Sequence, residues 1–101
     1  MPAVAAHVLA LTVDLRIADA TSLKEKRSVI TPILEGARRR HQVASAETGR
    51  QDVHHRAELG FVGVSGSAGH VTDVIDAVER FVWSFPEVEV VAAERHWLEV
   101  D

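Results

Sequence analysis

The chain concentrates its positive charge in one short stretch. Residues 22–41 begin Ser-Leu-Lys-Glu-Lys-Arg and end Ala-Arg-Arg-Arg-His. Lysine and arginine side chains bind phosphate groups, and the counterions released from a nucleic-acid backbone favour such contacts. A basic cluster of this kind therefore points to contact with RNA. The predicted RNA-binding residues are Lys24, Lys26, Arg27, Arg38, Arg39, Arg40, Arg50 and Arg56.

The same side chains also fit a solvated helix face, on which they form local ion pairs or lay their aliphatic stems over the edge of the core. The net charge of the chain is −4, but residues 22–56 carry eight basic against four acidic side chains, and residues 57–101 carry two against nine. A domain polarised in this way can steer a polyanion to one side. We therefore expect any RNA contact to be local.

Other residue types give no pattern for catalysis, a metal or a cofactor, so we expect a non-enzyme. The absence of cysteine excludes thiolate chemistry and disulfides. His54 and His55 are adjacent, so they point to opposite sides of an extended segment. With Asp52 and His70 they do not reproduce zinc-ligand spacing, and we interpret them as polar residues of a hairpin. The segment from Asp19 to Ser22 lacks the glycine-rich phosphate loop of acylphosphatases.

The basic stretch itself is predicted to be a helix over residues 22–41. Ser22 is a suitable N-cap, and Glu25 three residues later completes a capping box. Pro32 conflicts with the pattern, so we expect either a kink or a short first turn before the main helix. The buried stripe of this helix is predicted to be Leu23, Ile30, Ile33, Leu34 and Ala37.

The remaining segments complete a strand–helix–strand–strand–helix–strand order. Alternating or continuous apolar runs predict strands at 4–17, 42–48, 56–65 and 88–99, and helical spacing predicts a second helix at 70–85. Right-handed crossovers then give a four-stranded antiparallel sheet in the order 4-1-3-2, with both helices on one face. The sequence thus predicts one α+β domain over residues 1–101, a ferredoxin-like βαββαβ sandwich.

Two helices leave the other face of this sheet open. The strand patterns place five apolar side chains there, and a contiguous apolar patch usually marks a partner surface. We expect a two-fold homodimer through this open face, the alternative being a scatter of singly exposed apolar residues. The predicted interface residues are Val8, Ala10, Val91, Ala93 and Trp97.

Several short motifs together resemble a known family. They are Ser-Leu-Lys-Glu-Lys-Arg at 22–27, Val-Ala-Ser-Ala-Glu at 43–47, Gln51-Asp52, and Arg-Ala-Glu-Leu-Gly at 56–60. Combined, they are similar to the YlxP-like family of small bacterial proteins of unknown function. The resemblance runs from the first strand to Glu94 and implies a ferredoxin-like fold. It brings no catalytic residues. His54 stands where the family pattern leads us to expect an aromatic residue.

Members of that family are often encoded beside genes for transcription termination, translation initiation and ribosome binding. The resemblance therefore implies a non-catalytic accessory role in ribosome maturation or translation, with RNA or a pre-ribosomal particle as partner. The alternative is a dimeric regulatory domain of the same fold that senses a small molecule. The Met-Pro-Ala-Val start has no signal-peptide pattern, and no apolar run reaches membrane length, so we expect a cytoplasmic protein.

Overall fold

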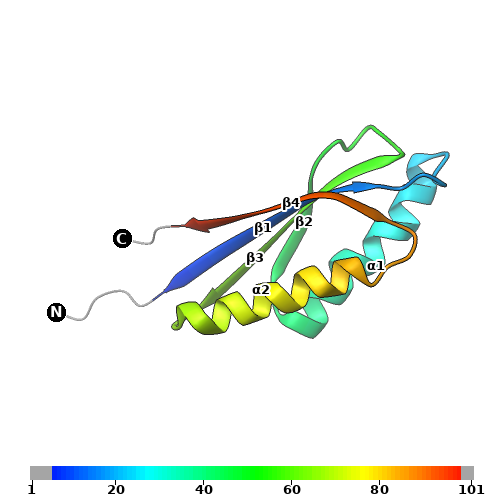
Figure 1. Cartoon of the computed structure of the whole chain (residues 1–101). Coiled ribbons are helices and arrows are strands. Elements are labelled where there is room, and N and C mark those ends of the chain that lie inside the picture. Colours follow the sequence, from blue (N-terminus) through cyan, green and yellow to red (C-terminus); the bar gives the residue numbers. More distant parts are fainter. Residues whose placement is uncertain (1–5, 99–101) are drawn as a thin grey trace.

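The computed structural model describes residues 6–98, which form one sheet and two helices (Figure 1). In chain order the elements are β1 (His7–Arg16), α1 (Leu23–His41), β2 (Ala44–Gly49), β3 (Arg56–Ser65), α2 (Ala68–Trp83) and β4 (Glu89–Leu98). The sheet has the order β2-β3-β1-β4, and every pair of neighbours is antiparallel. The predicted βαββαβ ferredoxin-like sandwich, including its strand order, is confirmed.

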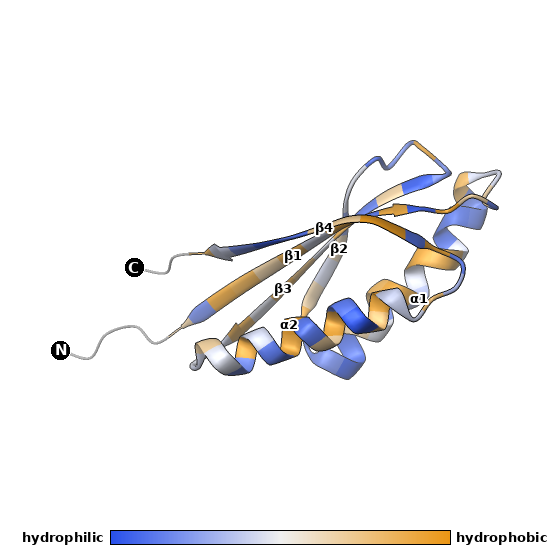
Figure 2. Cartoon of the chain, viewed as in Figure 1, coloured by the Kyte–Doolittle hydropathy of each residue, from blue (hydrophilic) through white to orange (hydrophobic). Residues whose placement is uncertain are grey.

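The core lies between the helices and the two central strands. On β1 the side chains of Leu9, Leu11, Val13 and Leu15 are buried, and each alternates with a partly exposed neighbour. β3 pairs with β1 over ten residues, which places Phe61 opposite Leu11 in the same buried layer. Figure 2 shows the hydrophobic colour concentrated along β1 and β3, while the outer part of β4 is hydrophilic. This period-two alternation is what fixes the register of the central pair.

The two helices pack against each other through a glycine. Gly36 of α1 is buried, and a Cβ atom added there would lie 2.4 Å from the ring Cζ of Phe81 on α2. The close approach therefore requires the absence of a side chain. α2 buries a stripe at helical spacing, formed by Val71, Ile75, Val78 and Val82. None of the helices in residues 6–98 is long and apolar enough to cross a membrane.

Element ends differ from the predicted ones for local reasons. α2 begins at Ala68 because the Ser67 hydroxyl accepts a hydrogen bond from the His70 amide at 3.3 Å. β2 begins only at Ala44 because Gln42, with φ of 55°, ends α1 in the left-handed conformation. α1 continues through Pro32, so it is not divided into a first turn and a main helix. The predicted strand residues 4, 5 and 99 lie outside the described part of the chain.

The predicted dimer face is corrected by the register of β4. Val8 and Ala10 do lie on the open face, because they alternate with the buried residues of β1. Trp97 is paired with buried Leu9, and Ala93 with buried Val13, so both lie on the helix side of the sheet. A β-bulge after Val90 accommodates Val91 as the extra residue. The five residues therefore do not share one surface.

The first turn of α1 is held by a three-residue cap. The Ser22 hydroxyl accepts a hydrogen bond from the Glu25 amide at 3.1 Å, as the capping box predicts. The Glu25 carboxylate, however, accepts from the amide of Thr21, at 2.8 Å, and from the Thr21 hydroxyl. Hydrogen bonds from Thr21 lower the pKa of Glu25, and the charge of His54 adds a smaller effect in the same direction.

The cap makes a testable prediction about pH. Because the folded pKa of Glu25 lies below the unfolded value of about 4.3, its stabilisation is complete above that value. It is lost as the pH falls through the folded pKa. The free energy of unfolding should therefore be measured by urea titration from pH 7 to pH 3 for wild type and Glu25→Gln. The gap between the two free energies should be constant near neutrality and should close in acid. Thr21→Ala, which removes the hydroxyl donor but keeps the backbone amide, should make this closing smaller. A gap that persists unchanged at pH 3 would contradict this account of the cap.

Candidate functional site

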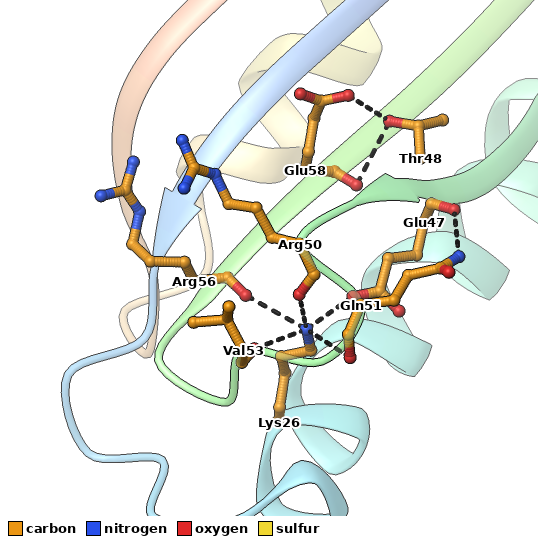
Figure 3. A network of polar contacts seen from close by, with 8 residues as sticks. All are labelled: Lys26, Glu47, Thr48, Arg50, Gln51, Val53, Arg56 and Glu58. Carbon is orange, nitrogen blue, oxygen red and sulfur yellow. Dashed lines mark hydrogen bonds and ion pairs between the residues drawn. The ribbon is translucent and has the colours of Figure 1, made fainter.

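Lys26, one of the predicted RNA contacts, lies in the interior of the protein. It precedes Ile30 by four residues, Ile33 by seven and Ala37 by eleven, which places it on the buried stripe of α1. Its side chain is 1% exposed. It extends from the helix toward the connection between β2 and β3, as Figure 3 shows.

The ammonium group of Lys26 is surrounded by oxygen atoms of that connection (Figure 3). It donates to the carbonyls of Val53 at 2.7 Å, Arg50 at 2.9 Å and Arg56 at 3.1 Å, with the Gln51 carbonyl at 3.5 Å. The Glu47 carboxylate lies 2.7 Å away as an ion pair. Glu47 Oε2 forms an ion pair with the ammonium group but no hydrogen bond, so it acts as a counter-charge. The three ammonium hydrogens thus have acceptors, and the buried charge is compensated.

These contacts contradict the prediction that Lys26 binds RNA. A side chain that is 1% exposed and already paired with Glu47 is not available to a phosphate. One sequence signal could have identified this buried lysine. Lysine is rarely buried, yet Lys26 is in register with the apolar residues of the buried stripe of α1. Glu47 was not among the predicted site residues.

Arg50 and Arg56, at the ends of the same connection, are both directed at Asp14 of β1. Arg56 Nη2 lies 2.8 Å from Asp14 Oδ2, and Arg50 Nη2 lies 3.4 Å from the same oxygen. Arg56 is paired across the sheet with Arg16, and Asp14 with Glu58, on the open face. The two arginines therefore belong to a partly neutralised cluster on the sheet and not to the helix surface.

The remaining predicted residues divide between two sides of α1. Lys24, Arg27 and Arg38 recur at helical spacing on the outward side, and Arg39 flanks them; all four are exposed. We call these four residues the outer basic face. Arg40 lies on the opposite side, over the ring of Phe81 at 5.3 Å from its centroid.

The outer basic face is free of ion pairs within residues 6–98. No carboxylate there lies within 4 Å of Lys24, Arg27 or Arg39. Arg38 donates to the carbonyl of Ser45 at 2.7 Å, which holds it toward β2. Arg27 and Arg38 are eleven residues apart, or about 16 Å along the helix axis. The face therefore presents two separated basic ends.

The histidine pair does not form part of a metal site in the described residues. The rings of His54 and His55 meet edge to face at 5.4 Å, and no group of three potential ligands surrounds them in the part of the chain seen here. Both side chains are exposed on the connection that Lys26 organises. They add polar surface next to the first turn of α1.

The fold and this arrangement define a small ferredoxin-like protein with an internal lysine and an external basic helix face. Comparison with known sequences places the chain in a family. Residues 8–95 match the model of the protein family of unknown function DUF503, so the chain belongs to that family. It is 37% identical over 81 residues to the uncharacterized protein YlxP of Bacillus subtilis (strain 168), which covers 80% of this chain and 88% of YlxP.

Solved structures resemble the chain in fold alone. The de novo designed protein Foldit4 aligns with a TM-score of 0.56 at 13% identity, over 95% of this chain and 99% of its own. A de novo designed protein with a ferredoxin fold, LFR1 1, aligns at 0.53 and 12% identity, over 90% and 82% of the two chains. The Bacillus subtilis YXEP protein, a dinuclear metal-binding peptidase, gives 0.53 and 12% over 91% of this chain but only 25% of its own.

The contacts of Lys26 predict that substituting Lys26 destabilises the protein far more than substituting Lys24. Lys26→Met removes the donor for three carbonyls and leaves the Glu47 carboxylate, which is 17% exposed, without its counter-charge. We expect a loss of about 3 kcal/mol or more in the free energy of unfolding, measured by urea titration. The matched variant Lys24→Met changes an exposed residue two positions away and should stay within about 0.5 kcal/mol of wild type.

A second variant separates charge from packing. Lys26→Met combined with Glu47→Gln removes both charges and should recover part of the loss. Equal stability of the Lys26→Met and Lys24→Met proteins would show that the network contributes nothing.

Proposed function

We propose that the protein is a non-catalytic accessory factor that docks on RNA of a ribosomal particle through the outer basic face of α1. The observation that carries the proposal is the exposure of Lys24, Arg27, Arg38 and Arg39 along one side of a helix. Exposed lysine and arginine side chains are the groups that contact phosphates. The ribosomal part of the proposal is drawn from the gene neighbourhood that the family resemblance implies.

Binding through the helix is favoured over binding through the sheet. Sheets of this fold bind single-stranded RNA by stacking bases on exposed aromatic side chains. Phe61, the aromatic residue of β3, is fully buried on the helix side. The open face carries valines, alanines and the Asp14 cluster in its described part, with the single ring of His96 on β4, so it lacks the several aromatic side chains of a stacking platform. Contacts from the outer basic face would then be mainly to phosphates.

The alternative, a small-molecule sensor, receives less support from the cavities. A cavity of about 330 Å³ between α2 and β4 is lined by Arg95, Asp76, Glu79, Arg80 and Trp83. Arg95 lies 2.7 Å from Asp76 and 3.0 Å from Glu79. The main charged groups that line the cavity are therefore already paired with one another, which leaves few free groups to orient a ligand.

Co-sedimentation with ribosomal subunits of Bacillus subtilis, the organism of the homologue YlxP, tests the proposal. Lys24→Glu with Arg27→Glu reverses two charges on the outer basic face and should abolish co-sedimentation. Because phosphate contacts release counterions, wild-type binding should weaken with added salt, with a slope that falls by about one for each contact removed.

The matched control reverses the same amount of charge elsewhere. Arg16→Glu with Arg80→Glu alters exposed arginines at the end of β1 and on α2, and gives the same net charge as the first variant. This control should co-sediment like wild type. If both double variants lose binding equally, the interaction depends on overall charge; if neither does, the helix face is not the contact. Either result rejects the proposal.

A further inference from the structure

β4 leaves one edge of the sheet without a partner in the described part of the chain. It is ten residues long, pairs with β1 on one side, and is exposed over most of both faces. Val91, Trp97 and Leu98 are 45%, 53% and 50% exposed. Proteins usually protect such an edge with a short strand, proline, a β-bulge or charged side chains. Here the bulge is confined to Val91, and the charge of Arg95 is already paired with Asp76 and Glu79. Residues 89–98 contain no lysine, proline or glycine, so after the bulge at Val91 this edge is a regular template for another strand.

The opposite edge of the sheet differs. β2 has only six residues and its pairing with β3 shifts near Thr48. α1 is attached to it by two hydrogen bonds: Arg38 donates to the Ser45 carbonyl at 2.7 Å, and the Ser45 hydroxyl donates to the Leu34 carbonyl at 2.8 Å. One edge is thus short and bound to a helix, while the other is long and open.

We propose that the open edge is covered by a second copy of this chain, paired antiparallel along β4. The sequence of β4 is self-complementary when Arg95 lies on the two-fold axis. Glu94 is then opposite the partner's His96, Ala93 opposite the partner's Trp97, and Ala92 opposite the partner's Leu98. Cross-strand side-chain pairs stabilise antiparallel strands, and a large side chain facing a small one fills space without overpacking.

Neighbouring registers lack this complementarity. An axis at Glu94 would place it against the partner's Glu94, and an axis at His96 would place Glu94 against the partner's Leu98. The chosen register does bring the two Arg95 side chains together. Each of them is already neutralised by Asp76 and Glu79 of its own α2, at 2.7 and 3.0 Å, so their mutual repulsion is reduced.

This dimer is an eight-stranded sheet and is independent of the proposed RNA contact. It uses the edge of β4, whereas the homodimer expected from the sequence uses the open face, on which Val62 is 37% exposed. All four helices lie on one side of the joined sheet, so the two outer basic faces belong to the same layer. The two kinds of dimer can be distinguished by single cysteines, because the chain has none of its own.

Cysteine cross-linking in the full chain tests the register. Only a residue on the axis meets its own copy, with directly opposite Cα atoms about 4.5–5.5 Å apart, which lies within the disulfide range. Arg95→Cys should therefore oxidise readily to a dimer, while Glu94→Cys and His96→Cys, offset along the strand, should not. Val62→Cys reports on the open face and should remain monomeric on a denaturing gel. Preferred cross-linking at 94, 96 or 62 overturns the proposal.

Charge exchange tests the pairing without a covalent bond. Glu94→Arg alone and His96→Glu alone each lose both Glu94–His96 pairs of the homodimer, and sedimentation equilibrium should show about 2- to 30-fold weaker association than wild type. A mixture of the two variants restores one arginine–glutamate and one histidine–glutamate pair, so it should form a heterodimer. Glu35→Arg, on the outward side of α1, should associate like wild type. A monomeric wild type, or a mixture that associates no better than its components, overturns the proposal.

Discussion

The arrangement of this protein depends on one buried ammonium group. Lys26 lies in the core stripe of α1, and a charge removed from water costs several kcal/mol unless oxygen atoms replace the solvent. The connection between β2 and β3 supplies them from the carbonyls of Arg50, Val53 and Arg56, together with the carboxylate of Glu47. One side chain thereby fixes both the packing of α1 and the conformation of a connection about 25 residues further along the chain.

The same interaction determines which basic residues remain available at the surface. Lys26 is withdrawn into the interior, and the two arginines that end the connection are directed at Asp14 on the sheet. The outward side of α1 keeps exposed basic groups without a described counter-charge, whereas Arg40 lies over the ring of Phe81. The predicted basic cluster is therefore not one surface but an internal cation, a sheet cluster and a helix face, and the proposed RNA contact involves only the helix face.

Much of the fold follows from patterns that are strong in the sequence. The alternation of β1 and the stripe of α2 each have one register that buries their apolar residues, and Ser22 is the N-cap of α1 as its position indicates. The cap of α2 at Ser67 was not predicted, and that helix begins two residues earlier than expected. β4 is the exception. Its alternation holds as far as Val90, and the bulge at Val91 then reverses which side each later residue faces. The burial of Lys26 was missed for another reason. Its acceptors come from a connection far along the chain, and no local sequence pattern shows that they converge on it.

The most direct test of this account is the side-chain ammonium spectrum of ¹⁵N-labelled protein. The chain has two lysines, so exposed Lys24 serves as an internal reference for Lys26. A buried, hydrogen-bonded Lys26 should give a sharp, slowly exchanging ammonium signal, and in protein that also carries ¹³C this signal should show couplings through hydrogen bonds to the carbonyl carbons of residues 50, 53 and 56. Two signals that exchange equally fast with water would contradict it, because they would place both lysines in solvent.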